Sequence, residues 1–292
     1  MSDDTACISS IFSQGDFNDD EIVVIRAFPG RLDIRKPAQV CRPVPPKRGL
    51  VTGFSKKSRL NFMKMMAALE WMPNVWQDFT FSDDVMGGLT VHQRHKKAAH
   101  CMKEFKREVG KIYPDAWGFW KKESEERKSG SLAGQEVPHY HMMMFLPGIS
   151  QGDYEKHCRK MARIWVHVTG TKNPKALEVS TNNKSYRWIN DAKHAMVYVS
   201  KYVAKPQDFD DGVSRGRFWG VVGKPPLADG IEMFLTHDEW QIMKRVFRRL
   251  YKKKKKMVKT FSRRFVNGFC FVGLPTILQV LEYVQQATAP PF

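Results

Sequence analysis

Residues 137–147 read Val-Pro-His-Tyr-His-Met-Met-Met-Phe-Leu-Pro, a run of large apolar side chains bounded by two prolines. This pattern predicts a buried β-strand. Because side chains alternate along a strand, His139 and His141 point to the same face of the sheet. Two imidazoles on one rigid strand form half of a site for a divalent metal. The alternative is a pair of ordinary histidines near a strand end, so the assignment depends on the rest of the chain.

Composition narrows the classes of function. The chain has 292 residues, which is enough for one large domain or two smaller ones with a full hydrophobic core. Its formal net charge is +18, from 48 Lys and Arg against 30 Asp and Glu. A chain this basic usually binds a polyanion, most commonly nucleic acid, although a merely solvated basic surface is the alternative.

Cysteine usage and hydropathy indicate the compartment. The N-terminus is acidic and lacks a signal-peptide pattern, and no apolar run reaches about 18 residues. No C-x-x-C pair occurs, so the sequence predicts neither a disulfide framework nor a zinc finger. We therefore expect a cytoplasmic protein without a membrane span. The five cysteines are Cys7, Cys41, Cys101, Cys158 and Cys270.

Apolar periodicity predicts helices and strands on both sides of the histidine strand. We expect helices over residues 56 to about 72, about 91–112, about 154–170 and 191–205, and strands over 75–82, from about 116, and over 176–180. The buried face of the helix over 91–112 carries Ala98, Met102, Phe105, Val109 and Ile112. Its exposed face carries Arg94, Lys96, Lys97, Lys103, Lys106 and Arg107.

A hairpin is predicted to bring carboxylates to the histidines. A polar connection over residues 128–135 joins the strand that starts near residue 116 to the histidine strand. Glu123 and Glu125 share a face of that first strand. Either carboxylate would complete a His-His-carboxylate site for a divalent metal. The strand register decides which glutamate faces the histidines, and a solvated charge cluster is the alternative.

A second constellation lies in the helix expected over residues 191–205. At 100° per residue, Tyr198, Lys201, Tyr202 and Lys205 form one polar patch beside an apolar face. The alternative is two half-buried tyrosines with lysines that reach the solvent. A tyrosine hydroxyl can attack a phosphodiester if a metal polarises the phosphate and cations meet the developing charge. The lysines are spaced to lower the pKa of the phenol or to bind that phosphate.

These motifs together resemble those of rolling-circle replication initiators of the HUH endonuclease superfamily. The segment 138–141, Pro-His-Tyr-His, is similar to the metal-binding motif, and 198–205, Tyr-Val-Ser-Lys-Tyr-Val-Ala-Lys, is similar to the two-tyrosine motif. Residues 79–82 and 216–220 are similar to flanking segments of the family. Glu123 stands where relatives carry a glutamate, whereas Glu125 replaces a usual glutamine, and the loop before His139 is longer. The resemblance covers about residues 75–225.

The resemblance implies an α+β fold, with a central five-stranded antiparallel sheet that has helices packed on one face and the metal and nucleophile on the other. It also implies nicking of an origin in single-stranded or hairpin DNA. One tyrosine would keep the 5′ phosphate and leave a free 3′ hydroxyl for a host polymerase, and rejoining would reverse that step. Two tyrosines would allow alternate cuts. A phage or plasmid source, and hence the cytoplasm of a bacterial host, follows from the same resemblance.

The domain boundaries follow from composition. We expect an N-terminal arm, partly extended, over residues 1–50, the nicking and joining domain over 51–228, and a basic helical region over 229–292. No Walker loop appears, so strand opening would need a host helicase. The C-terminal helix is expected to bind phosphates without reading bases, the alternative being a solvated charge run. Its candidate DNA-binding residues are Arg245, Arg248, Arg249, Lys252, Lys253, Lys254, Lys255 and Lys256.

Two other classes of protein fit parts of this pattern. A transposase or relaxase would use the same chemistry for strand transfer, although relaxases usually place the tyrosine before the histidine motif. A non-catalytic nucleic-acid-binding protein would share the charge and lack the cleavage. The oligomeric state, the origin sequence and the tyrosine that cuts first are not encoded in any pattern of this chain.

Overall fold

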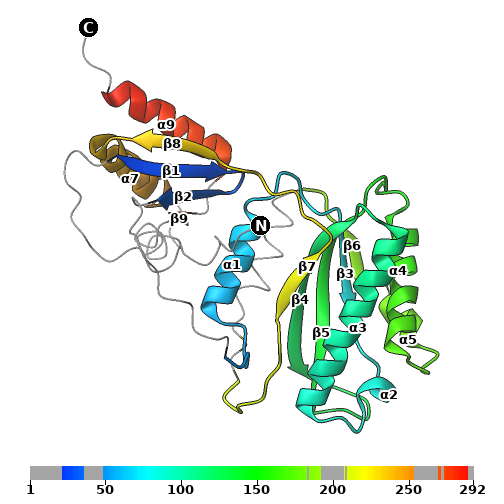
Figure 1. Ribbon diagram of the computed structural model, residues 1–292. Coiled ribbons are helices and arrows are strands. Elements are labelled where there is room, and N and C mark those ends of the chain that lie inside the picture. The colour runs from blue at the N-terminus through cyan, green and yellow to red at the C-terminus, as the bar shows by residue number, and fades with distance from the viewer. Residues whose placement is uncertain are drawn as a thin grey trace. The chain divides into compact units, whose positions relative to one another are not determined.

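The computed structural model describes residues 22–35, 49–182, 184–191, 207, 209–252, 269–270 and 273–288 (Figure 1). The chain divides into two compact units. The first contains residues 1–46, 64–70 and 227–292, and the second contains residues 47–63 and 71–226. Along the chain, the second unit is therefore largely an insertion within the first.

The second unit is built on a five-stranded antiparallel sheet in the order β6-β3-β5-β4-β7. The predicted α+β class and five-stranded antiparallel sheet are confirmed. The predicted hairpin is also confirmed, since β4 and β5 pair along their whole length. The strands are β3 (Val75–Phe79), β4 (Trp117–Glu126), β5 (Glu136–Phe145), β6 (Tyr186–Trp188) and β7 (Trp219–Val222).

Helices α3 (Val91–Ile112) and α4 (Tyr154–Thr169) cover one face of this sheet (Figure 1). Both helices were predicted, and their sequences explain their ends. Thr90 and Gln93 form a capping box at the start of α3, and Gly170 ends α4 in the left-handed conformation at φ 68°. The core beneath them is aromatic: the Trp165 ring lies 5.1 Å from Phe79 and 5.7 Å from Phe105. This packing holds α3 and α4 against one face of the sheet.

A third helix packs on the opposite face, so the prediction that helices cover one face only is wrong. Helix α1 (Lys56–Met66) places the Phe62 ring 5.8 Å from Phe119 and 5.0 Å from Trp219. Alternation along β4 puts Phe119 on the face that also carries Glu123. The aromatic residues at this end of the face require apolar cover, which the sequence pattern of β4 alone did not reveal.

The strand predicted over residues 176–180 is also wrong, because this segment is the short helix α5 (Ala176–Ser180). Side chains that follow it bond back to its carbonyls: the Thr181 hydroxyl donates to Leu177 O at 2.7 Å, and Asn182 Nδ2 donates to Val179 O at 2.9 Å. Five residues of mixed polarity do not distinguish a strand from one helical turn. Another short helix described in this unit is α2 (Asp83–Met86).

In its described residues, the first unit contains a four-stranded sheet in the order β8-β1-β2-β9 and the helices α7 and α9. Residues 23–35, expected to belong to an extended arm, instead form a β-hairpin whose first strand pairs with β8. Ile25, Met243 and Ile277 are fully buried in its core. No helix in the described ranges is long and apolar enough to cross a membrane. The elements are β1 (Val23–Phe28), β2 (Arg31–Arg35), β8 (Ile231–Leu235), α7 (His237–Lys252), β9 (Phe269–Cys270) and α9 (Leu274–Thr288).

Candidate metal centre

Glu123, His139 and His141 converge on one point of the sheet, opposite the face that α3 and α4 cover. The register pairs Glu123 directly with His139. The Nε2 atoms of the two histidines lie 3.1 Å apart, and Glu123 Oε2 lies 3.5 Å from His139 Nε2 and 3.3 Å from His141 Nε2. Each residue offers one ligand atom, and the three atoms lie within 4.8 Å of one another. Two imidazole nitrogens and one carboxylate oxygen form a donor set that suits a divalent metal.

Asp78 orients one of these ligands. Its Oδ1 atom accepts a hydrogen bond from His141 Nδ1 at 2.6 Å and another from Trp76 Nε1 at 2.8 Å. With the proton on Nδ1, the Nε2 atom of His141 keeps a lone pair directed at the other two ligands. An unprotonated nitrogen that faces a second imidazole and a carboxylate fits a metal better than it fits hydrogen bonding within the protein.

Lys121 orients the carboxylate ligand from the same strand. Its side chain is buried, and its ammonium forms an ion pair with Glu123 Oε1, which leaves Oε2 on the side of the histidines. Burial alone would raise the pKa of Glu123, but hydrogen bonds with His139 and His141 and the charge of Lys121 hold it well below its usual range. Glu123 is therefore ionised and ready to bind a cation.

The pKa of His141 is shifted in the opposite direction from that of Glu123. Burial would lower the pKa of His141, but hydrogen bonds with Asp78 and Glu123 raise it above the usual value. A bound divalent cation would replace the proton, since a histidine must be neutral at the ligating nitrogen. We therefore expect metal binding to compete with protonation at this residue.

The structure shows which of the two candidate glutamates lies beside the histidines. Glu123 belongs to the cluster, whereas Glu125 is exposed and pairs with Val137, two residue pairs beyond the Glu123–His139 pair. Neither Asp78 nor Lys121 was predicted as a site residue. The two-residue period of a strand could have indicated them. Asp78 shares a face of β3 with Trp76, and Lys121 shares a face of β4 with Glu123.

The tyrosine constellation lies outside the described residues, which include neither 192–206 nor any of its four candidates: Tyr198, Lys201, Tyr202 and Lys205. The first described residue after it is Gln207. The Gln207 side chain donates to Ser124 O at 3.1 Å, and the Gln207 carbonyl accepts from Phe54 N at 2.7 Å. The chain that leaves the tyrosine segment is thus bonded to the residue next to Glu123.

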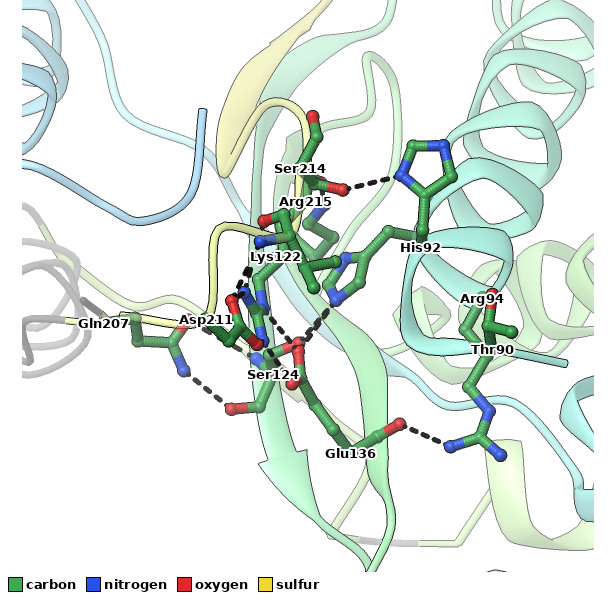
Figure 2. Close-up of polar contacts among 12 residues, drawn as sticks. Thr90, His92, Arg94, Lys122, Ser124, Glu136, Gln207, Asp211, Ser214 and Arg215 are labelled. Atoms are coloured by element: carbon green, nitrogen blue, oxygen red, sulfur yellow. Dashed lines mark hydrogen bonds and ion pairs between the residues drawn. The ribbon is translucent and has the colours of Figure 1, made fainter. Parts of the chain in front are cut away.

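A buried polar network behind the sheet fixes the segment that follows Gln207 (Figure 2). Arg215 donates from Nε and Nη2 to the two oxygens of Glu136, both at 2.7 Å, and from Nη2 to Asp211 at 2.6 Å. The Lys122 ammonium donates to the Arg215 carbonyl, and burial lowers the pKa of Lys122 to about 7. His95 Nε2 lies 2.9 Å from the same glutamate. The network ties residues 211–215 to the hairpin that carries the metal ligands.

Arg94 corrects one expectation about α3. It was placed on the exposed face, but it is buried and donates to Met86 O at 3.1 Å and to Glu136 O at 2.9 Å. A basic residue in an amphipathic pattern reads as solvent-facing unless its carbonyl partners are known. These partners come from helix α2 and strand β5, which the pattern of α3 does not show.

The C-terminal candidates belong to the first unit. Arg245, Arg248 and Arg249 are exposed on α7, while Trp240 and Phe247 are buried on its other side. Lys252 is the last residue of α7, and its side chain is outside the described part of the structure. The four lysines that follow are also outside it: Lys253, Lys254, Lys255 and Lys256.

No protein-family model matches the sequence, and no curated protein or solved structure shows a significant similarity to the chain. The class of site is therefore defined by its own geometry. It is a His-His-carboxylate cluster on the face of an antiparallel sheet opposite α3 and α4, with one imidazole and one carboxylate each held by a charged neighbour.

Proposed function

We propose that the protein is a metal-dependent endonuclease and ligase that nicks and rejoins single-stranded DNA to initiate and terminate rolling-circle replication. The observation that carries the proposal is the cluster of Glu123, His139 and His141 on a five-stranded antiparallel sheet. Two further observations support it: the net charge of +18, and the bonds that hold Gln207, just after the tyrosine segment, beside Glu123.

The three ligands would hold Mg2+ or Mn2+. When bound, such an ion polarises a phosphodiester and stabilises its charge during displacement. Asp78 and Lys121 would keep His141 and Glu123 in their binding orientations before the DNA arrives, which is the preorganisation that a catalytic centre requires.

The reaction proposed for the tyrosines is a transesterification without net hydrolysis. The phenolic oxygen of Tyr198 or Tyr202 attacks phosphorus, a bond forms between this oxygen and phosphorus, and the bond from phosphorus to the 3′ oxygen breaks. The leaving 3′ oxygen gains a proton and the phenol loses one, so atoms and charge balance. Lys201 and Lys205 are placed in sequence to meet the phosphate charge. The reverse attack by a 3′ hydroxyl rejoins the strand.

The partners follow from the same chemistry. The DNA substrate would be an origin that is single-stranded or extruded as a hairpin, and the 3′ hydroxyl would prime a host polymerase. A host helicase would open the duplex ahead of it.

The decisive experiment incubates the full chain with circular single-stranded DNA and Mn2+ or Mg2+ and measures both nicking and covalent DNA–protein adducts. We expect nicking that requires the metal, and an adduct that maps to a tyrosine. The His139→Ala/His141→Ala variant should bind DNA and fail to nick. Metal-dependent nicking by that double variant would overturn the site, and tight DNA binding by the native chain without any cleavage would identify a binding protein instead.

A further inference from the structure

A cleft of about 830 Å³ opens along β7, which is the edge strand of the five-stranded sheet. The start of α1, the preceding residues 49–53 and the β7 strand line most of it. All of its lining residues belong to the second unit. Those used below are Lys57, Lys106, Trp120, Arg217, Trp219 and Gly220.

The charges of the cleft suit an anion. Lys57, Lys106 and Arg217 come from three separate segments, and no acidic residue is among the lining residues. In the described part of the chain none of these three cations has a carboxylate partner. The first turn of α1 contains no acidic residue either, so the positive end of the helix dipole faces the cleft uncompensated.

Trp120 supplies an independent sign of a ligand. The residue is 8% exposed, and its Nε1 atom has no hydrogen-bond partner in the described structure. Its indole lies against Gly220, where an added Cβ would come within 2.6 Å of a ring carbon. The bare glycine thus keeps the edge strand open over the indole. A buried donor without a partner is uncommon in folded proteins, which suggests that an acceptor outside the chain uses it.

The cleft also offers an aromatic surface near the metal centre. Trp219 stacks on Phe62 at 5.0 Å and donates to Ser58 Oγ at 2.9 Å, so its ring is held in place. In the sheet, Trp219 pairs with Lys121, whose ammonium contacts the metal ligand Glu123. The cleft therefore begins one strand away from the metal cluster.

From these contacts we infer that the cleft binds single-stranded DNA beside the cleavage position. The α1 N-terminus and the three cations would hold backbone phosphates, and Trp219 would stack on a base. This inference rests on the proposed function, because it extends the DNA path from the metal centre to the edge of the sheet.

Binding is tested with a fluorescein-labelled single-stranded oligonucleotide in the uncleaving His139→Ala/His141→Ala background. The triple variant Lys57→Gln/Lys106→Gln/Arg217→Gln should lower the slope of log K against log salt by about 2, at about 0.7 for each lost phosphate contact. The control triple Lys96→Gln/Lys97→Gln/Lys103→Gln removes the same charge from exposed positions of α3 and should change the slope less. Equal slopes for the two triple variants would overturn the inference that the cleft binds DNA.

A second measurement locates the DNA directly and does not depend on a variant that folds. An oligonucleotide that carries 4-thiothymidine should photo-cross-link to the peptide that contains Trp219, and cross-links confined to other peptides would refute the inference. The two proposals can fail separately. Cross-linking at Trp219 without nicking by the native chain would refute only the proposed function. Nicking without a cross-link at Trp219 would refute only the inference that the cleft binds DNA.

Discussion

Asp78 Oδ1 lies 2.6 Å from His141 Nδ1, and the two residues face each other directly across β3 and β5. The strand register therefore affects the chemistry of the site, because the contact with Asp78 decides which imidazole nitrogen of His141 carries the proton. The His141 ring also packs 5.5 Å from Trp76, which belongs to the same strand as Asp78. The ligand is therefore held in position by β3 although it belongs to β5.

We predict that Asp78→Asn weakens Mn2+ binding by about 10- to 100-fold, since the amide lacks the charge that fixes the histidine tautomer. Isothermal titration calorimetry of the full chain measures this change. Asp115→Asn removes the same charge from an exposed turn and should leave the affinity unchanged. Equal affinity in Asp78→Asn and the native chain would show that Asp78 does not orient the ligand.

The two glutamates of β4 form a matched pair for the third ligand. Glu123→Gln should reduce Mn2+ affinity by at least about tenfold, because it removes the anionic oxygen that faces both histidines. Glu125→Gln changes the same group two residues away and should leave metal binding intact, since Glu125 is exposed and outside the cluster. Loss of metal binding in Glu125→Gln with retention in Glu123→Gln would reverse the assignment.

The ion pair between buried Arg215 and half-buried Glu136 should make the protein sensitive to acid. Burial would raise the pKa of Glu136, but hydrogen bonds with Arg215 and His95 lower it well below its usual range. A lowered folded pKa contributes stability above the pKa of the unfolded chain, and this contribution is lost as the pH falls toward the folded value. The loss should therefore begin below about pH 5.

Urea unfolding followed by tryptophan fluorescence measures this contribution. Glu136→Gln should cost about 3 kcal/mol at pH 7, because it leaves Arg215 buried with one carboxylate fewer. Between pH 5 and pH 3 the native chain should lose more stability than this variant does. Glu155→Gln, at an exposed position of α4, is the control and should follow the native chain. Parallel curves for all three proteins would contradict the predicted role of the pair.

The tyrosines should act as alternative nucleophiles. Each has a lysine three residues later, so Tyr198→Phe and Tyr202→Phe should each retain some cleavage, and the double variant should have none. Single variants should fail at complete turnover, where the second cut occurs while the first tyrosine is occupied. Mass spectrometry of the DNA–peptide adduct checks this, and adducts on only one tyrosine in every variant would reduce the site to a single nucleophile.

The basic end of α7 and the lysines that follow it in the sequence should bind DNA through phosphates alone. Replacing Arg248, Arg249 and the lysines over 252–256 by Gln should weaken binding to any DNA sequence. The slope of log K against log salt should fall by roughly 0.7 to 0.9 for each lost contact. Affinity measured over a salt series checks this, and an unchanged slope would show that the run is solvated.

Local patterns predicted the metal-bearing hairpin well. Two prolines and an apolar run marked β5, and the period of two placed His139 and His141 together. Which glutamate joins them was open, because both lie on one face of β4 and a register shift of two residues would place Glu125 opposite His139. Asp78 and Lys121 were missed for the same reason, since their roles appear only once β3 and β4 are aligned with β5.

Long-range pairing explains the other errors. The strand at Val23–Phe28 finds its partner at Ile231–Leu235, some two hundred residues later, and no local pattern records that pairing. Arg94 looked exposed because its acceptors, the carbonyls of Met86 and Glu136, belong to other segments. The segment 176–180 was too short for its period to decide between helix and strand.

The sheet that joins β1 and β2 to β8 and β9 has a consequence for synthesis on the ribosome. The hairpin of β1 and β2 leaves the exit tunnel well before its neighbours β8 and β9 are translated. The unit with the metal ligands is complete by residue 226, so it can fold while the hairpin still has two unpaired edges. A chain released between residues 226 and 231 would thus carry an intact metal centre and bare strand edges, and such a product is prone to aggregation.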